Sequence, residues 1–546
     1  MRETRLKKEY LPFALGTLIW VITVLWINFH GAQWYNFDMY ADADVARRMA
    51  EQNTLFPRDW IFGNQYYVIA TPVVASLFYH ACHNSVLAMS FASSLMFCLI
   101  LLCCVWSFRP IFSAQALWVG LFCMAGGTLL GDSISSSTYG FQILYTMASY
   151  YACYLLVIVL HIGIWVRLRK NRRLSPVFPV LALMGSFALG VQSPRETLSL
   201  CIPLLLVTLI LWLRYRKDPG EKKSLVFAAA SLTGNLLGLY LHRVAGEHWG
   251  IQTATNVNTL GSGVTSGSIL ERISESGRAF LDLVGLRYLH YGWKWKPLAV
   301  LGIFLLFLAV TALVGSLKKR ETADARMPVI FCWISILGVF AAGVLVIQVR
   351  AIYYFVWYLL VPLSVSVLCD LLPNKRKILF CTAVLLCGAV NYFYNVYPDI
   401  SKYREQKQFY TEVVSRLEEL GVKTVYGDYQ APTIAACSDA RIGFSSVFPN
   451  AGAEPGNEGG LLIPYGSPVS TEAYHRVDPE SSGLVLSDSP YDELSGYRYL
   501  NNYLSAEYRE SFEGFFKLED CFESPQLTYY FYSFTSPALF EDGMIR

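Results

Sequence analysis

Segments long enough to cross a lipid bilayer alternate with short basic clusters over the first 396 residues. A spanning helix needs about 20 apolar residues. Eleven segments reach or approach that length: 11–29, 86–107, 111–131, 143–166, 177–193, 197–213, 224–243, 297–316, 327–347, 352–371 and 378–396. Basic residues cluster between them, at 109, 167–173, 214–223, 318–320 and 375–377. Because cytoplasmic loops are rich in Lys and Arg, a cytoplasmic N-terminus places every cluster inside the cell. The pattern predicts an α-helical polytopic membrane protein with about eleven spans.

The charge distribution divides the chain in two. Residues 396–546 carry 11 Lys+Arg against 23 Asp+Glu, a net of −12, whereas the remainder carries 33 against 18, a net of +15. We therefore predict a transmembrane domain at 1–396 and an acidic extracytoplasmic domain at 397–546 of a multi-pass plasma (inner) membrane protein. The basic residues lie in short loops between spans, so we expect them to face membrane lipids and the cytoplasm, with no nucleic-acid partner.

Three outer segments are large enough to hold a site: residues 31–85, residues 245–297 and the C-terminal domain. The apolar stretch 66–78 is short and is interrupted by Pro72, so we expect a helix that lies at the interface without crossing. In the C-terminal domain, helices near 402–420 and 431–437 alternate with strands near 423–426, 441–447, 483–487 and 527–534, which predicts an α/β domain. Its two cysteines, Cys437 and Cys521, either form a disulfide or remain free.

Three carboxylates follow the first span closely. Asp38, Asp42 and Asp44 lie in the first outer segment among aromatic residues that include Tyr40. In a helix, Asp38 and Asp42 would share a face and Asp44 would point away; in an irregular turn, all three could converge on one catalytic site. Such carboxylates can act as a general base, and Asp42 with Asp44 could bind a divalent cation such as Mg²⁺ or Mn²⁺. The alternative is an ordinary solvated loop beside an interfacial aromatic belt.

Two arginines lie in very short outer turns. Arg195 and Arg350 are each close to hydrocarbon, where a charge requires a partner, and Arg350 is followed by Tyr353. Arginine is well suited to bidentate phosphate binding, so both are candidate ligands for a lipid phosphate. A salt bridge to Glu196 is the alternative for Arg195. In the second large outer segment, His290 and Lys294 could also contact substrate or could instead extend from the interface towards water.

This layout resembles the GT-C glycosyltransferases. The resemblance rests on the order of Asp38 to Tyr40, residues 46–49 and residues 60–63 in the first outer loop, and on residues 426–433 with 438–441 in the exported domain. The nearest subgroup is that of bacterial enzymes related to protein mannosyltransferases and lipid A aminoarabinose transferases. The resemblance implies a sugar donor carried on polyprenyl phosphate, inversion at the anomeric carbon and a first-loop Asp that serves as general base or metal ligand.

The resulting hypothesis is an enzyme, a hexosyl- or pentosyltransferase that uses a lipid-linked sugar. It would transfer the sugar on the outer face to a glycan, lipid or protein acceptor, with Asp38 as the base. Two alternatives remain open: a lipid or polysaccharide transporter or flippase, and an envelope polysaccharide polymerase or ligase. The span interiors hold few charged residues, whereas ion-coupled transporters usually place such residues near the bilayer midplane.

Overall fold

The computed structural model describes residues 2–63, 65–131, 141–147, 149–170, 174–249, 251, 268–318, 323–345, 350–439, 441–450, 461–464, 469–470, 478, 480–490 and 495–535. Nine helices in these ranges are long and apolar enough to cross a membrane. They belong to α1 (Arg2–His30), α4 (Ser85–Phe108), α7 (Ala152–Arg169), α9 (Ile202–Arg214), α10 (Pro219–His248), α12 (Lys296–Lys318), α13 (Ala323–Leu345), α14 (Trp357–Leu371) and α15 (Asn374–Asn395).

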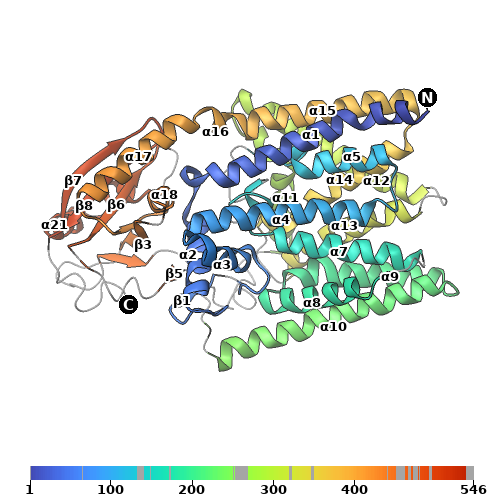
Figure 1. Cartoon of the computed structure of the whole chain (residues 1–546), viewed down its shortest axis with the longest axis horizontal. Coiled ribbons are helices and arrows are strands. Elements are labelled where there is room, and N and C mark those ends of the chain that lie inside the picture. Colours follow the sequence, from blue (N-terminus) through green and yellow to red (C-terminus); the bar gives the residue numbers. More distant parts are fainter. Residues whose placement is uncertain are drawn as a thin grey trace.

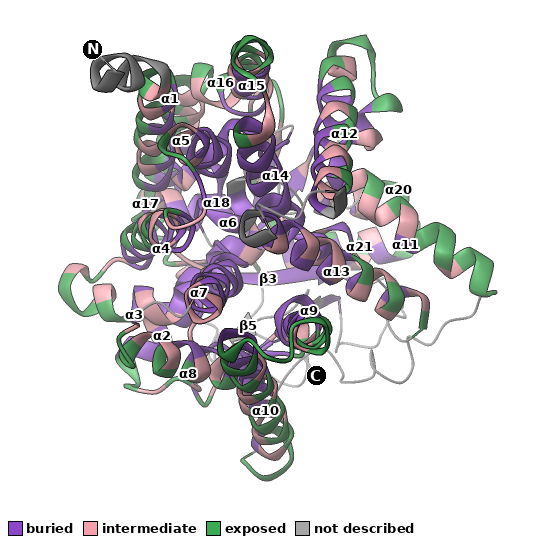
Figure 2. Cartoon of the chain, turned by 90° about the vertical axis from the view of Figure 1, so that its right-hand side faces the viewer, coloured by how far each residue is buried: buried purple, intermediate pink, exposed green. Residues whose placement is uncertain are grey.

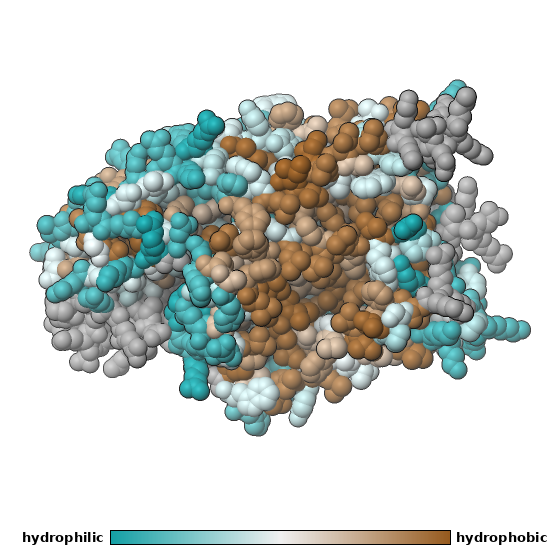
Figure 3. Space-filling view, in the orientation of Figure 1, coloured by the Kyte–Doolittle hydropathy of each residue, from teal (hydrophilic) through white to brown (hydrophobic). Residues whose placement is uncertain are grey.

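Two shorter apolar helices occupy the remaining predicted positions. These are α5 (Ala114–Phe122), which a π-helical turn extends to Gly127, and α8 (Val177–Gln192). The predicted helical membrane architecture with a C-terminal α/β domain is therefore confirmed. The helices run roughly parallel in one bundle (Figure 1), and on the face shown in Figure 3 apolar residues gather over the bundle between more polar ends.

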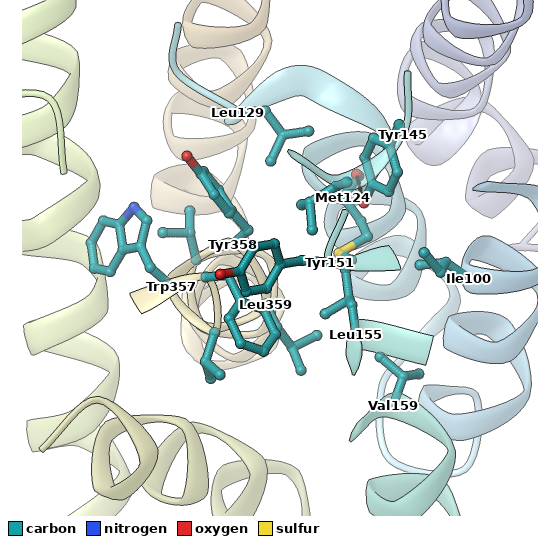
Figure 4. Packing of buried hydrophobic residues seen from close by; sticks show 14 of the residues in the cluster. Ile100, Met124, Leu129, Tyr145, Tyr151, Leu155, Val159, Trp357, Tyr358 and Leu359 are labelled. Atoms are coloured by element: carbon teal, nitrogen blue, oxygen red, sulfur yellow. Dashed lines mark hydrogen bonds between the residues drawn. The ribbon is translucent and has the colours of Figure 1, made fainter. Parts of the chain in front are cut away.

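The centre of the bundle is filled by large side chains. Trp357, Tyr358 and Leu359 of α14 pack near Tyr151 and Leu155 at the start of α7 (Figure 4). Viewed along the bundle, α7 and α14 are largely buried, whereas α10 and α15 expose much of their surface at the periphery (Figure 2). Burial on all sides explains why α14 is apolar around its whole circumference.

The segment predicted as a span at 143–166 differs in the structure, because its helix begins only at Ala152. Asn28 of α1 holds the preceding backbone in another conformation: its side chain accepts from the Met147 amide at 2.9 Å and donates to the Tyr145 carbonyl at 3.1 Å. Met147 and Ser149 both have positive φ, which a right-handed helix does not allow. The result is a turn that brings Tyr150 and Tyr151 to the end of the bundle that carries α2.

The basic clusters that the structure describes lie together at one end of the bundle. Arg169 forms an ion pair with Glu221 at 2.8 Å, and Lys170 donates to the Pro110 carbonyl at 3.2 Å. Asp370, at the end of α14, accepts from Ser113. The N-terminus lies at this same end (Figure 1). The assignment of this end to the cytoplasm stays a prediction.

The first outer loop occupies the opposite end of the bundle. It contains the 3-10 turn η1 (Ala32–Trp34), α2 (Phe37–Glu51), the two-residue strand β1 (Trp60–Ile61) and α3 (Thr71–Cys82). Helix α3, predicted as a non-crossing helix, is 12 residues long and lies beside α2 next to the C-terminal domain (Figure 1).

The C-terminal domain is built on a six-stranded sheet in the order β4-β3-β2-β6-β8-β7. Its strands are β2 (Thr424–Gly427), β3 (Gly443–Pro449), β4 (Leu462–Pro464), β6 (Ser482–Asp488), β7 (Phe516–Glu523) and β8 (Thr528–Phe534). Strands β3, β2 and β6 pair in parallel and the other pairs are antiparallel. The helices are α16 (Tyr397–Ser401), α17 (Tyr403–Glu419), α18 (Pro432–Cys437), α20 (Gly496–Asn502) and α21 (Ala506–Phe515). Cys437 and Cys521 are both free thiols.

Candidate active site

Helix α2 places the first two carboxylates on one face. Its N-cap is Asn36, whose side chain accepts from the Met39 amide at 3.1 Å. This cap fixes the start of the helix, so Asp38 lies in the first turn and Asp42 one turn later. A carboxylate in the first turn is favoured by the partial positive charge of the helix N-terminus.

Asp42 is buried and Asp38 is half-buried, and the two have different partners. Burial raises the pKa of Asp38, and the positive charge of Arg350 acts in the opposite direction. Burial raises the pKa of Asp42 well above its ordinary value, and the nearby charge of Asp38 raises it further, while a 2.5 Å hydrogen bond from the Tyr67 hydroxyl opposes the shift. Two carboxyl groups this close do not readily ionise together. Arg350 favours ionisation of Asp38, so the arrangement supports one charge on Asp38 and a proton on Asp42.

Asp44 has a different environment on another face of α2. Its carboxylate forms ion pairs with Arg47 at 2.6 Å and Arg48 at 3.0 Å. Arg48 also pairs with Asp59, and Arg47 pairs with Glu51 at 2.9 Å. The two arginines hold the pKa of Asp44 below its ordinary value despite burial. Asp44 thus belongs to an ion-pair network and does not converge with Asp38 and Asp42.

The arrangement of Asp42 and Asp44 is not that of a shared metal site, since each carboxylate is engaged by a different set of side chains. Within the described ranges, no group of three or more His, Cys, Asp or Glu side chains could hold a metal ion. Binding of a divalent cation by this pair stays a prediction.

Arg195 lies between two tyrosine rings. Its guanidinium is 5.4 Å from the ring centre of Tyr151 and 5.6 Å from that of Tyr353. Glu196 does not pair with it, because the Glu196 carboxyl accepts a 3.1 Å hydrogen bond from Ser186, a residue of α8. No carboxylate among the described residues forms a salt bridge with Arg195, so the alternative of a pair with Glu196 is not what the structure shows.

Hydrogen bonds join the turn that carries Arg195 to the first outer loop. Arg195 donates to the Gln65 side-chain oxygen, which also accepts from Tyr154 at 3.0 Å. Gln192 accepts from the Val68 amide at 3.2 Å. The same region places Arg195 near Tyr67, where its positive charge opposes the rise of the tyrosine pKa. Arg195 and Arg350 therefore act electrostatically on the two members of one cluster, Tyr67 and Asp38.

Three tyrosines surround the acidic pair. Tyr67 bonds to Asp42, and the charges of Asp38 and Asp42 both raise the pKa of Tyr150. The hydroxyls of Tyr35 and Tyr150 are buried and have no hydrogen-bond partner among the described residues. Since buried hydroxyls are usually satisfied, these two are available to a bound ligand. Sequence reasoning missed Tyr150, because it lies within a segment predicted to be a span and carries no signal that sets it apart there.

The other predicted substrate contacts lie elsewhere. Tyr40 packs against Phe444 of the C-terminal domain, with ring centres 5.8 Å apart, and does not point towards the acidic pair. His290 and Lys294 are exposed, and the Lys294 ammonium lies 5.2 Å from the ring centre of Trp295. No described contact joins them to Asp38 or Asp42, so they match the alternative of interfacial side chains extending to water. The Gly-rich stretch 261–267 in the same outer segment lies outside the described residues.

The C-terminal domain covers this site. Thr433 of α18 donates a 2.6 Å hydrogen bond to the Tyr35 carbonyl, and Trp34 donates a 2.9 Å hydrogen bond to the side chain of Gln406 on α17. Strand β1 of the first loop pairs antiparallel with β5 (Val469–Ser470). The domain therefore fixes both the beginning of the first loop and its middle.

Comparison with known proteins finds solved structures with a similar fold. No known family matches the sequence, and no curated protein matches it. The whole chain is similar to the crystal structure of ArnT from Cupriavidus metallidurans bound to undecaprenyl phosphate. The TM-score is 0.50 and the sequence identity 12%, over 97% of this chain and 99% of that one.

This chain shares its overall fold with that structure. The match covers the C-terminal domain as well as the bundle, since only 3% of either chain or less lies outside it. At 12% identity the similarity establishes the architecture, and the chemistry of the site must be argued from this chain's own residues.

Proposed function

We propose that the protein is a membrane glycosyltransferase that moves a sugar from a polyprenyl-phosphate carrier to an acceptor at the outer surface. The observation that carries the proposal is the cluster of Asp38, Asp42, Arg350 and Arg195 under the C-terminal domain of a GT-C fold. ArnT, which shares the fold, was solved with undecaprenyl phosphate, and this supports a polyprenyl phosphate as the carrier here.

The charges of the cluster suit such a donor. With Asp42 protonated, one carboxylate and two guanidinium groups leave a net charge of +1. A sugar linked to a polyprenyl phosphate is a phosphodiester with a single negative charge. The guanidinium groups of Arg350 and Arg195 bind the phosphate oxygens, and their attraction is strong because little water reaches them.

Asp38 is the general base in this mechanism. It takes the proton from an acceptor hydroxyl as that oxygen forms a bond to the anomeric carbon. The bond from the anomeric carbon to the phosphate oxygen breaks, and its electron pair stays on the phosphate. The attack comes from the side opposite the leaving group, so the configuration inverts. The departing phosphate gains a second negative charge, which the two arginines balance.

The remaining polar groups position these components. Burial and the charge of Asp38 favour the protonated form of Asp42, and the hydrogen bond from Tyr67 holds the Asp42 carboxyl in place. The unpartnered hydroxyls of Tyr35 and Tyr150 are suited to the sugar hydroxyls. Asp42 and Asp44 have separate partners, and the two arginines supply the positive charge for the leaving phosphate.

Mass spectrometry of cell-envelope glycans tests the proposal for any sugar and any acceptor. Four strains are compared: native, deletion, and deletions complemented with Asp38→Asn or with Glu405→Gln, a change of an exposed acid on α17. We expect the deletion and Asp38→Asn strains to lack the same sugar mass, and the Glu405→Gln strain to match the native profile. Normal glycans in the deletion strain would contradict the glycosyltransferase function. Normal glycans in the Asp38→Asn strain alone would remove Asp38 as the base.

A further inference from the structure

A second site lies on the other face of α2. A cleft of about 620 Å³ separates the first outer loop from the C-terminal domain, and its lining includes Tyr40, Asp44, Arg47 and Trp60 on one side and Lys423 with Phe444 on the other. We call it the interdomain cleft. Its volume is typical of a small-molecule site, and domain interfaces are frequent locations for such sites.

The cleft is distinct from the acidic pair. Its lining contains Asp44 but neither Asp38 nor Asp42. Phe37 lines the cleft, and its ring centre is 6.1 Å from that of Tyr429, whose hydroxyl raises the pKa of Tyr150 beside the acidic pair. The N-terminal end of α2 thus lies between the cleft and the proposed catalytic centre.

The wall that the first loop contributes is polar, although an apolar surface would be enough to hold the C-terminal domain in place. It carries the ion pairs of Asp44 with Arg47 and Arg48, whose side chains are 13%, 31% and 10% exposed. Well-packed apolar residues would join two domains at least as firmly, because desolvated ion pairs give little net stability. Charged groups kept in fixed positions beside an open cavity are better explained by recognition of a ligand.

The residues that line the cleft are suited to a carbohydrate. Four aromatic residues contribute to the lining, Tyr40, Trp60, Tyr79 and Phe444, and aromatic side chains usually line ligand pockets, where they can contact the C–H surfaces of a sugar. The opposed charges largely cancel, since the lining carries four Lys or Arg against three Asp or Glu. The hydroxyl groups of a sugar can therefore accept and donate hydrogen bonds along both walls. The small net charge of the lining does not favour an anion.

We infer that the interdomain cleft binds the carbohydrate part of the acceptor. This inference rests on the proposed glycosyltransferase function and specifies its acceptor as a glycan. The donor phosphate is assigned to the arginines near the acidic pair, so the cleft is left for the second substrate. A glycan held there extends past the end of α2 and presents one hydroxyl to Asp38.

Photo-crosslinking in living cells tests this assignment directly. A benzophenone amino acid replaces Lys423, an exposed residue at the cleft, and in a matched control replaces Tyr503, an exposed residue of the same domain outside the cleft lining. Both are made in the full-length chain carrying Asp38→Asn, expressed in cells of its source, irradiated and analysed by mass spectrometry of peptides. We expect hexose- or pentose-containing adducts at position 423 and none at 503. Adducts of lipid or peptide only, equal glycan adducts at both positions, or no adduct at 423 would overturn the inference.

A kinetic experiment distinguishes failure of this inference from failure of the proposed function. Envelope extract from the deletion strain, which retains unmodified acceptor, is titrated against purified native protein and against Lys423→Trp, which obstructs the cleft at an exposed position. We expect half-maximal transfer by Lys423→Trp to need about tenfold more extract, with the maximal rate and inhibition by undecaprenyl phosphate unchanged. Unchanged dependence on extract would overturn the cleft assignment. Absence of transfer by the native protein would instead contradict the proposed function, while the crosslinking result would still test glycan binding.

Discussion

The two faces of α2 give aspartate side chains opposite environments. Asp38 and Asp42 are desolvated with no ion pair in the described structure, and burial raises the pKa of both. Asp44, two residues after Asp42, is held between Arg47 and Arg48, and its pKa is lowered. All three acids lie within seven residues of one helix. Partners across each face, and not the local sequence, therefore decide whether a carboxylate can take part in proton transfer or stabilises the loop.

Loss of the Asp38 carboxylate should give the largest effect on catalysis. Asn has nearly the same size but cannot take a proton, so Asp38→Asn should lower the transfer rate by about 10²- to 10⁴-fold. Initial rates with purified protein at saturating donor measure this change. The amount of folded protein and its thermal midpoint should remain close to those of the native protein, since the substitution removes no ion pair.

Loss of the Asp44 carboxylate should affect stability instead. Asp44→Ala leaves Arg47 and Arg48 with one partner fewer at a partly buried site, while Glu51 and Asp59 remain, so the loss should cost about 1–3 kcal/mol. A lower thermal midpoint in detergent and less folded protein in the membrane are the expected results. If Asp44→Ala folded normally and moved the acid limb of the pH–rate profile, the proposed separation between the two faces of α2 would be wrong.

Arg350 should affect both donor binding and the pH profile. Arg350→Gln removes a charge-assisted phosphate contact, so kcat/KM for the donor should fall by about 10- to 100-fold. Asp38 acts as a base only when ionised, so transfer declines as the pH falls through its pKa. Without the opposing charge of Arg350 that pKa rises further, and the acid limb of the rate profile should move to higher pH. Arg243→Gln, which breaks only an exposed ion pair with Glu247, is the matched control.

The smallest expected effect concerns Asp42. A protonated Asp42 carries no charge, so Asp42→Asn should leave the acid limb of the pH–rate profile in place and lower the rate by less than about tenfold. The Asn oxygen can still accept from Tyr67. A shift of the acid limb to lower pH would show instead that the native Asp42 is ionised beside Asp38.

Most of the architecture could be predicted from the sequence, because spans and strands are determined by local patterns. The helices found at Ala114–Phe122 and Tyr403–Glu419, and the strand at Thr528–Phe534, lie close to their predicted positions. The exception is the segment before Ala152, which is apolar enough to span. There the contact with Asn28, more than a hundred residues earlier, prevents a helix. No local pattern contains that information.

The candidate site could be predicted only in part, for the same reason. The helical spacing separated Asp44 from Asp38 and Asp42, and the short turns identified Arg195 and Arg350. Tyr150 is brought to the acidic pair by the turn after Met147, and Tyr429 by the docking of a domain nearly 400 residues away in the chain. These depend on contacts between distant segments, as does the exposure of His290 and Lys294 at the surface.

The hydrogen bond between Thr433 and Tyr35 also has a consequence for the time at which the site is completed during synthesis. Its partners are 398 residues apart, which the ribosome needs about 20 to 80 s to translate at about 5–20 residues per second. During that interval the first outer loop is already inserted but lacks the domain that covers it. An incomplete or truncated chain would therefore expose the acidic pair to water and would be inactive. The C-terminal domain can therefore cover the acidic pair only after synthesis of the polypeptide has reached Thr433.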